Sequence, residues 1–183
     1  MAIQLSPEVL TQNTAIMGII DADYAMLVPS SAEGSVLDMP QGIDCALGYE
    51  GYITGIHKLA NRYGVNPNNT ENEIIAASIG KQAALGLEEV SETDFAQSLL
   101  QVVPHIRGSF SLMVRYKDEL FVTRDRNDEH SVFFGTLQAG GFAITSLFKA
   151  MQDLKAEGVT ELRPGTLARF EADAIHTTRW AFQ

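Results

Sequence analysis

The sequence contains little cysteine, little positive charge and no long apolar run. Its single cysteine, Cys45, excludes a disulfide framework within the chain and a zinc site built from several cysteines. Residues 1–15 lack the basic start and apolar run of a secretory signal, and no apolar stretch approaches the ~20 residues that cross a bilayer. We therefore expect a protein of the reducing cytoplasm with no membrane partner.

The charge balance is acidic, with 23 acidic and 13 basic residues and a formal net charge of -10. A protein that neutralises a phosphate backbone needs the opposite balance, so we expect no nucleic-acid partner. The 183 residues, 45% of them hydrophobic, suit one globular domain over 1–183, with 1–12 as an N-terminal extension. Whether this domain forms a homo-oligomer is left open.

The apolar pattern predicts strands, then helices, then strands. Strands are expected over 15–20, 24–28, 45–47, 109–115, 119–123, 132–137, 142–146, near 161, and over 166–170 and 175–180. Helices are expected over 53–62, from Thr70 to about Gly86, from Ser91 to Val103, and over 147–154. Residues 29–43 are expected to form a loop, and residues 48–51 a turn that opens the first helix.

Two helix starts have a specific signature. Thr70 is followed three residues later by Glu73, and Ser91 by Asp94. Both pairs are capping boxes, in which the hydroxyl and the carboxylate each accept a hydrogen bond from the other residue's backbone. The element order as a whole predicts an α+β fold in which helices cover the outer faces of a two-sheet core.

Several short motifs follow one another in an order that resembles a known family. They are Met17-Gly18-Ile19, the stretch 46–53, Thr70-Glu71-Asn72-Glu73, Arg124-Asp125, Ile144-Thr145-Ser146 and Arg163-Pro164-Gly165. Their order resembles the class II glutamine amidotransferase domain, which is the glutaminase half of amidophosphoribosyltransferases. The resemblance implies a four-layer α/β/β/α sandwich of the N-terminal-nucleophile (Ntn) hydrolase type, with two antiparallel sheets flanked by helices.

The resemblance also implies that the residues of the family's chemistry have changed. Met17 stands where active members have the cysteine nucleophile, and Leu147 stands at a glutamate position. Glu50 replaces the asparagine that, with the glycine at Gly51, forms the oxyanion hole, and losing one such donor costs about 3–4 kcal/mol of transition-state stabilisation. Glu71 corresponds to the aspartate that holds the glutamine amino group. The segment between Met17 and Tyr49, which in the family includes an arginine motif that grips the substrate carboxylate, is shortened.

We therefore predict no catalytic residue and no cofactor. The candidate ligand-binding residues are Tyr49, Glu50, Gly51, Thr70 and Glu71. The leading hypothesis is a non-enzymatic module that binds a small metabolite or amino acid, or docks onto a partner protein. The alternatives are an active amidohydrolase or glutaminase subunit that supplies ammonia to a separate synthase, and a purely structural dimerisation unit.

Other candidate reactive groups have simpler structural interpretations. Cys45 lies in an apolar strand with no base beside it in sequence, and Thr14 becomes an N-terminal nucleophile only if the chain is cut after Asn13. The four histidines, His57, His105, His130 and His176, do not have metal-ligand spacing, so no metal site is predicted. Glu71, Glu73 and Asp125 could hold a ligand amine, although carboxylates in a first helical turn also stabilise the helix dipole.

Overall fold

The computed structural model describes residues 16–21, 24–29, 35–38, 44–85, 90–127, 129–138, 140–171 and 174–181. The elements are β1 (Ile16–Asp21), β2 (Tyr24–Pro29), β3 (Ser35–Asp38), β4 (Asp44–Thr54), α2 (Ile56–Tyr63), α3 (Glu71–Ala83), α4 (Glu92–Val102), η2 (Val103–His105), β5 (Arg107–Tyr116), β6 (Glu119–Arg124), β7 (Phe133–Thr136), β8 (Phe142–Thr145), α5 (Phe148–Asp153), β9 (Glu157–Glu161), β10 (Thr166–Phe170) and β11 (Ile175–Arg179).

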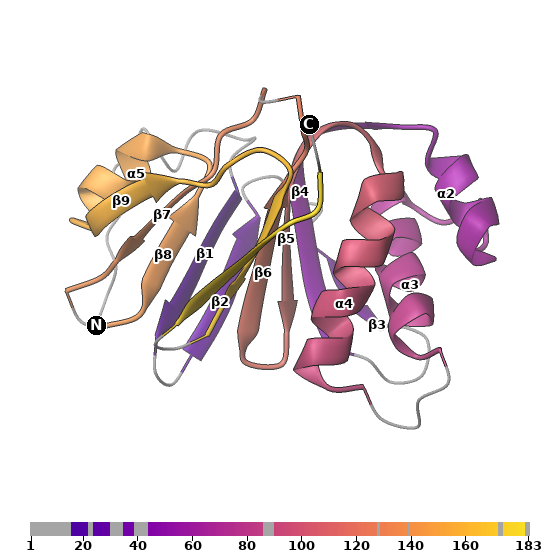
Figure 1. Ribbon diagram of the computed structural model, residues 1–183, viewed down its shortest axis with the longest axis horizontal. Coiled ribbons are helices and arrows are strands. Elements are labelled where there is room, and N and C mark those ends of the chain that lie inside the picture. Colours follow the sequence, from indigo (N-terminus) through magenta and orange to yellow (C-terminus); the bar gives the residue numbers. More distant parts are fainter. Residues whose placement is uncertain are drawn as a thin grey trace.

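These elements form two antiparallel sheets and two helical layers. One sheet has the strand order β2-β1-β8-β7-β9, and the other has the order β11-β10-β6-β5-β4-β3. Figure 1 shows the sheets face to face, with α3 and α4 on the outer side of the six-stranded sheet and α5 on the outer side of the five-stranded sheet. The predicted α+β fold, a four-layer sandwich, is confirmed. Within the described residues, no helix has the length and apolar character needed to span a bilayer.

Two local predictions in the first half of the chain are wrong. The expected turn over 48–51 lies inside β4, which runs without interruption and pairs with β5 along its whole length. Gly51 has a φ of +106° and so bends the strand where a turn was expected. The expected loop over 29–43 contains β3, which pairs with the start of β4. The predicted helix end at Gly86 lies outside the described residues, and α3 ends at Ala83.

Both predicted capping boxes are present. Thr70 Oγ1 accepts a hydrogen bond from Glu73 N at 3.3 Å, while Thr70 N donates to Glu73 Oε2 at 2.7 Å. Ser91 Oγ accepts from Asp94 N at 3.2 Å, while Ser91 N donates to Asp94 Oδ2 at 3.1 Å. Each box satisfies two backbone donors, and replacing such a cap with alanine typically costs about 1 kcal/mol.

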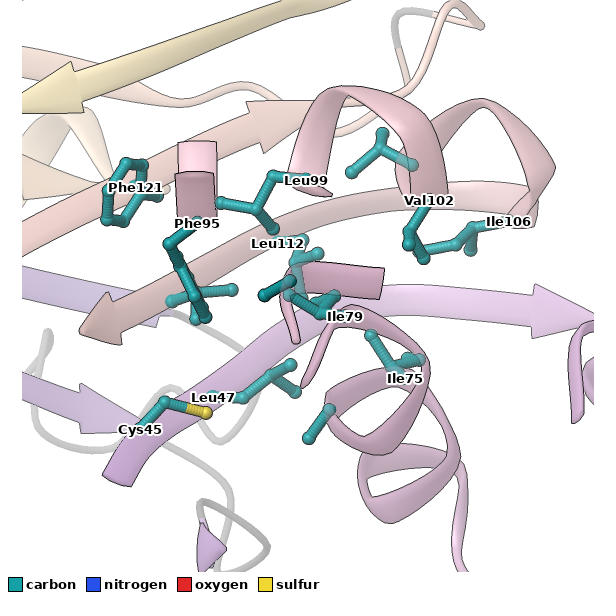
Figure 2. Close-up of a cluster of buried hydrophobic side chains, with 14 of the residues drawn as sticks. Cys45, Leu47, Ile75, Ile79, Phe95, Leu99, Val102, Ile106, Leu112 and Phe121 are labelled. Carbon is teal, nitrogen blue, oxygen red and sulfur yellow. The ribbon is translucent and has the colours of Figure 1, made fainter. Parts of the chain in front are cut away.

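The main core lies between the six-stranded sheet and its helices (Figure 2). On β5, Phe110, Leu112 and Val114 belong to this core, whereas Met113 belongs to a second core between the two sheets. Strand side chains alternate between faces, so Ser109 and Ser111 must also face the layer between the sheets. This alternation decides where every candidate site residue on β4 and β5 points.

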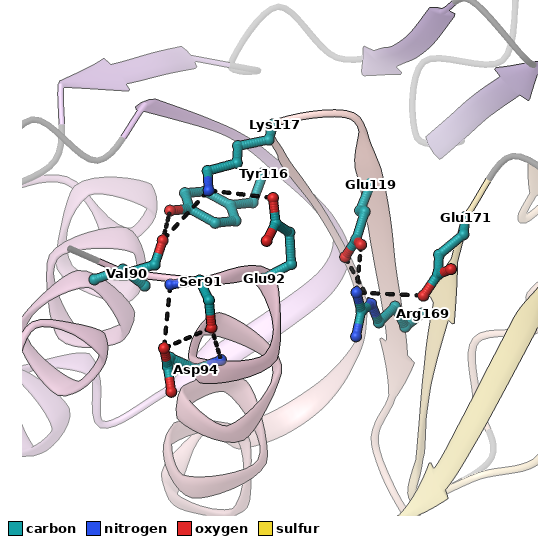
Figure 3. A network of polar contacts seen from close by, with 9 residues as sticks. All are labelled: Val90, Ser91, Glu92, Asp94, Tyr116, Lys117, Glu119, Arg169 and Glu171. Carbon is teal, nitrogen blue, oxygen red and sulfur yellow. Dashed lines mark hydrogen bonds and ion pairs between the residues drawn. The ribbon is translucent and has the colours of Figure 1, made fainter.

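A polar network joins the start of α4 to the six-stranded sheet (Figure 3). Lys117, in the turn between β5 and β6, lies 3.1 Å from the Glu92 carboxylate, and the Tyr116 hydroxyl donates to the Val90 carbonyl at 2.8 Å. The pKa of Glu92 is lowered, first by a hydrogen bond from its own backbone and then by the hydrogen bond from Lys117. Because α4 packs on this sheet, these contacts fix the helix's position along the strands.

Candidate functional site

The structure divides the predicted ligand-binding residues between the two faces of β4. Tyr49 packs against the core under the helices, and its hydroxyl donates to the carboxylate of Glu71, the first residue of α3. Glu50 is the next residue of the strand, so its side chain points to the opposite face, toward the five-stranded sheet. The five residues therefore do not surround one ligand position.

The helix-side group consists of Tyr49, Thr70 and Glu71. Thr70 caps the start of α3, and the hydroxyl of Tyr49 donates a hydrogen bond to Glu71. These contacts fasten the start of α3 to the middle of β4. The group thus has a structural role that is visible in its hydrogen bonds.

A row of three polar residues crosses the other face of the sheet. In the register of the strands, Glu50 on β4 lies opposite Ser111 on β5, which lies opposite Arg124 on β6. Directly opposed Cβ atoms are about 4.5–5.5 Å apart, so the three side chains are neighbours in the layer between the sheets. Ser109 lies two residues from Ser111 on the same face.

Among the described residues of this layer, three side-chain oxygen atoms are buried without a hydrogen-bond partner. They are Glu50 Oε2, Ser109 Oγ and Ser111 Oγ. Both serines are 0% exposed. Burying a hydroxyl without a partner costs about 1–3 kcal/mol, so natural proteins rarely leave several such groups together. We name these three residues, Glu50, Ser109 and Ser111, the inter-sheet polar cluster.

His130 and Gly51 lie beside this cluster. His130 Nδ1 lies 3.8 Å from Glu50 Oε1, with side chains 24% and 18% exposed. A Cβ atom added to Gly51 would lie 2.8 Å from His130 Nε2 and 2.1 Å from the Ser109 carbonyl oxygen. The absence of a side chain at Gly51 therefore lets the imidazole ring and the neighbouring strand approach the backbone closely.

The retained Arg124-Asp125 pair is part of the framework. Arg124 is 1% exposed, and its Nη1 donates to Glu161 Oε1 at 2.9 Å and to the Leu162 carbonyl at 2.6 Å. Glu161 ends β9 in the five-stranded sheet, so Arg124 joins the two sheets. Asp125 is buried, and its carboxylate accepts hydrogen bonds from the backbone of Phe110 and Asn127.

The three carboxylates of the proposed acidic cluster, Glu71, Glu73 and Asp125, form hydrogen bonds with different partners. Glu71 binds Tyr49, Glu73 closes the capping box, and Asp125 accepts hydrogen bonds from two backbone N–H groups. Each carboxylate already has a structural partner.

The nucleophile position and the other reactive candidates lie in separate parts of the structure. Met17 is in β1, where its backbone lies opposite Val28 of β2 and Thr145 of β8. Leu147, at the family's glutamate position, is the residue before α5, and its backbone N–H donates to Thr145 Oγ1 at 3.0 Å. Cys45 is 1% exposed in the helix-side core. Thr14 lies outside the described residues.

The histidines also lie apart. His57 and His105 are on the helical side, and His176 is exposed on β11, 3.4 Å from Glu171. Among the described residues, no group of three or more His, Cys, Asp or Glu side chains could hold a metal ion. Only His130 lies against the inter-sheet polar cluster.

Sequence reasoning did not identify Ser109, Ser111 or His130 as site residues. Ser109 and Ser111 could have been identified from the sequence. They are two small polar residues that alternate with apolar residues on a strand that is buried on both faces. No sequence pattern identified His130, because its approach to Gly51 depends on how a loop distant in sequence folds.

The comparisons with known proteins agree with the overall fold. No family model matches the chain. It is 27% identical over 149 residues to an amidophosphoribosyltransferase of Mycobacterium bovis, an alignment that covers 76% of this chain and 27% of the relative. The solved glutamine phosphoribosylpyrophosphate amidotransferase of B. subtilis superimposes with a TM-score of 0.69 at 13% identity, covering 95% of this chain and 44% of that one.

A shorter solved protein is similar along most of its length. The predicted glutamine amidotransferase of Pseudomonas aeruginosa has a TM-score of 0.58 at 8% identity, and the match covers 88% of this chain and 86% of that chain. The chain has the fold of a class II glutamine amidotransferase domain. This amidotransferase-like chain spans about a quarter of the length of the mycobacterial relatives it matches, and under half of the B. subtilis chain.

Proposed function

We propose that this amidotransferase-like chain binds a small ligand between its two sheets and does not hydrolyse glutamine. The observation that carries the proposal is the inter-sheet polar cluster, in which Glu50, Ser109 and Ser111 each have a buried atom without a hydrogen-bond partner. A bound polar ligand would satisfy those atoms. The class II amidotransferase fold supports the location, because Glu50 and Gly51 occupy the positions of the family's oxyanion hole.

The residues at the family's reacting positions argue against hydrolysis. A cysteine attacks as the negatively charged thiolate that forms when the thiol loses its proton, whereas the thioether of Met17 has no proton to lose and cannot form a thiolate. An oxyanion hole needs hydrogen-bond donors, and an ionised Glu50 offers only acceptors. Its carboxylate would raise the energy of a negatively charged intermediate.

The chemistry of the cluster indicates the class of ligand. A carboxylate accepts hydrogen bonds, and a serine hydroxyl donates one and accepts others. A ligand with an ammonium or amide group, on the scale of a free amino acid, matches this set. His130, which lies 3.8 Å from the opposite oxygen of Glu50, adds a ring nitrogen at the edge of the cluster.

The alternative function, an active subunit that supplies ammonia to a synthase, requires another nucleophile. Cys45 is the only thiol in the sequence, and it lies 1% exposed on the helix side of β4, the opposite face from Glu50. Cys45 therefore cannot supply the nucleophile at this site, and Thr14 could do so only if the chain is cut after Asn13.

We expect the purified chain to release no ammonia from L-glutamine above the rate in buffer. The physical reason is that a class II site without its thiol and its oxyanion donor loses both the attacking group and the stabilised intermediate. The measurement is a coupled ammonia assay over hours, with an active class II amidotransferase as the positive control. Sustained release that disappears in Cys45→Ser would overturn the proposal.

Binding is tested separately through Ser111. We expect Ser111→Ala to raise the free energy of unfolding without ligand by up to about 1 kcal/mol, because it removes a buried hydroxyl without a partner. The same variant is expected to weaken the binding of L-glutamine or L-glutamate at least tenfold, measured by calorimetry.

The matched control is Ser78→Ala, because Ser78 is equally buried but donates to the Ile74 carbonyl at 2.7 Å. We expect that variant to lower stability slightly and to leave binding unchanged. If Ser111→Ala behaves like Ser78→Ala in the denaturation curves, the Ser111 hydroxyl has a partner and the cluster is not a ligand site. If neither amino acid binds the unmodified chain at millimolar concentration, the ligand class is wrong.

A further inference from the structure

A concave region lies on the other side of the six-stranded sheet from the inter-sheet polar cluster. It is an open hollow of about 940 Å³ among the carboxyl-terminal ends of α2, α3 and α4. Its polar lining consists of Arg62, Tyr63, Lys81, Gln82, Gln101 and His105. Figure 1 shows α3 and α4 on the outer side of the six-stranded sheet, and the residues that line the hollow lie at or just after the ends of these helices and of α2.

The hollow concentrates positive charge on an acidic chain. Among the residues that the structure describes, Arg62, Lys81 and His105 line it and no aspartate or glutamate does, although the sequence has 23 acidic and 13 basic residues. Within the described part of the chain, neither Arg62 nor Lys81 forms an ion pair with a carboxylate. On a surface with this composition, cations without carboxylate neighbours are available to an external anion.

Helix capping explains only part of this arrangement. Lys81 Nζ donates to the carbonyl of Gly64 just after α2, which is a common role for a lysine near a helix end. The ammonium group has three donors, so this contact leaves capacity for a second partner. Burial, and after it the positive charge of Arg62, lower the pKa of His105, so this ring contributes less positive charge to the hollow than Arg62 and Lys81 do.

We propose that this hollow binds a small oxyanion, either inorganic phosphate or the phosphate group of a small metabolite, through Arg62 and Lys81. A guanidinium group presents parallel N–H donors that match two oxygens of a phosphate, and an ammonium group adds a compact charge. Gln82 and Gln101 supply amide groups for the rest of a ligand. The Tyr63 and His105 rings, 6.3 Å apart between centroids, form an aromatic wall. The site is independent of the ligand proposed between the sheets.

The test is calorimetric titration of the full chain with inorganic phosphate and with glycerol phosphate at constant ionic strength. We expect saturable binding of at least one of the two, and at least a tenfold rise in Kd in the double variant Arg62→Gln with Lys81→Gln. The matched control, Lys58→Gln with Arg107→Gln, removes two exposed positive charges elsewhere. It is expected to change the Kd less than twofold.

A second variant covers the case in which the double substitution unfolds the chain. Gln82→Glu removes none of the cationic groups and places a carboxylate among them, so it is expected to weaken binding at least tenfold with the melting curve preserved. The proposal is overturned if neither phosphate compound binds at millimolar concentration, if the control pair weakens binding as much as the pocket pair, or if Gln82→Glu binds normally. Preference for glycerol phosphate over phosphate would identify a metabolite site rather than a phosphate-ion site.

Discussion

Replacing Arg124 with alanine is expected to lower the free energy of unfolding by about 3–5 kcal/mol. The side chain is almost fully buried, and it donates from β6 to Glu161 and Leu162, which belong to the opposite sheet and the residue after it. Its loss leaves a cavity and an unpaired carbonyl group at Leu162, which is 3% exposed. Urea denaturation followed by circular dichroism measures the change.

Two further variants separate the causes of that loss. Arg124→Met keeps most of the buried volume, so it should recover the packing part of the loss but not the hydrogen bonds. Arg163→Ala is the matched control, because Arg163 is an exposed arginine one residue after Leu162, and we expect it to change stability by no more than about 0.5 kcal/mol. Equal effects of Arg124→Ala and Arg163→Ala would contradict the role of Arg124 as a connection between the sheets.

The position of Arg124 links the stability prediction to the proposed ligand site. Arg124 lies opposite Ser111, which lies opposite Glu50, so the residue that joins the sheets is also the end of the polar row. The distance between the sheets at this row is set partly by Arg124 and Glu161. A variant that loosens this connection is therefore expected to disturb ligand binding as well as stability.

The elements predicted best are those with strictly local signals. The capping boxes at Thr70 and Ser91 were found from residue types three positions apart, and β10 was predicted with its observed ends. The prediction of a turn over 48–51 was wrong because a pair of glycines is consistent with two structures. They can form a turn, or they can allow a neighbouring group to approach the backbone closely inside a strand. Only the pairing of β4 with β5, which involves residues far apart in sequence, distinguishes the two cases.

The sequence predicted some residues of the candidate site but not the side chains that lie around them. The motif order located Glu50 and Gly51, and the fold places them on the strand next to β5. The sequence could not show that Tyr49 and Glu71 form a hydrogen bond on the opposite face, because that requires knowing that β4 continues through Tyr49 and Glu50. Ser109, Ser111 and His130 join the site only through strand register and a distant loop.

The motif residues that this chain retains and those that it has changed differ in their roles. Arg124 and Asp125 are retained, and both are buried in hydrogen bonds that hold strands together. The resemblance implies that Met17, Glu50 and Leu147 correspond to positions where the family has reactive or substrate-binding groups. This division is what we expect if the framework serves a purpose other than glutamine hydrolysis, as proposed above.

Gly51→Ala is expected to lower the free energy of unfolding by about 3 kcal/mol or more. A non-glycine residue at a φ of +106° is strained by about 1–3 kcal/mol, and a Cβ only 2.1 Å from the Ser109 carbonyl oxygen forces β4 and β5 apart. The matched control is Gly140→Ala. Gly140 has a φ of +93° but no atom within 4 Å of the added Cβ, so it reports the backbone strain without the collision. Thermal and urea denaturation of both variants give the difference.

The difference between Gly51→Ala and Gly140→Ala tests why residue 51 is a glycine. The family pairs its glycine with an asparagine in the oxyanion hole, yet here Glu50 replaces the asparagine and the glycine remains. If Gly51→Ala costs at least about 2 kcal/mol more than Gly140→Ala, the approach of β5 and His130 is sufficient reason for glycine, with no catalytic role needed. If the two variants cost the same, the positive φ alone accounts for the glycine at position 51, and the expected collision with β5 is wrong.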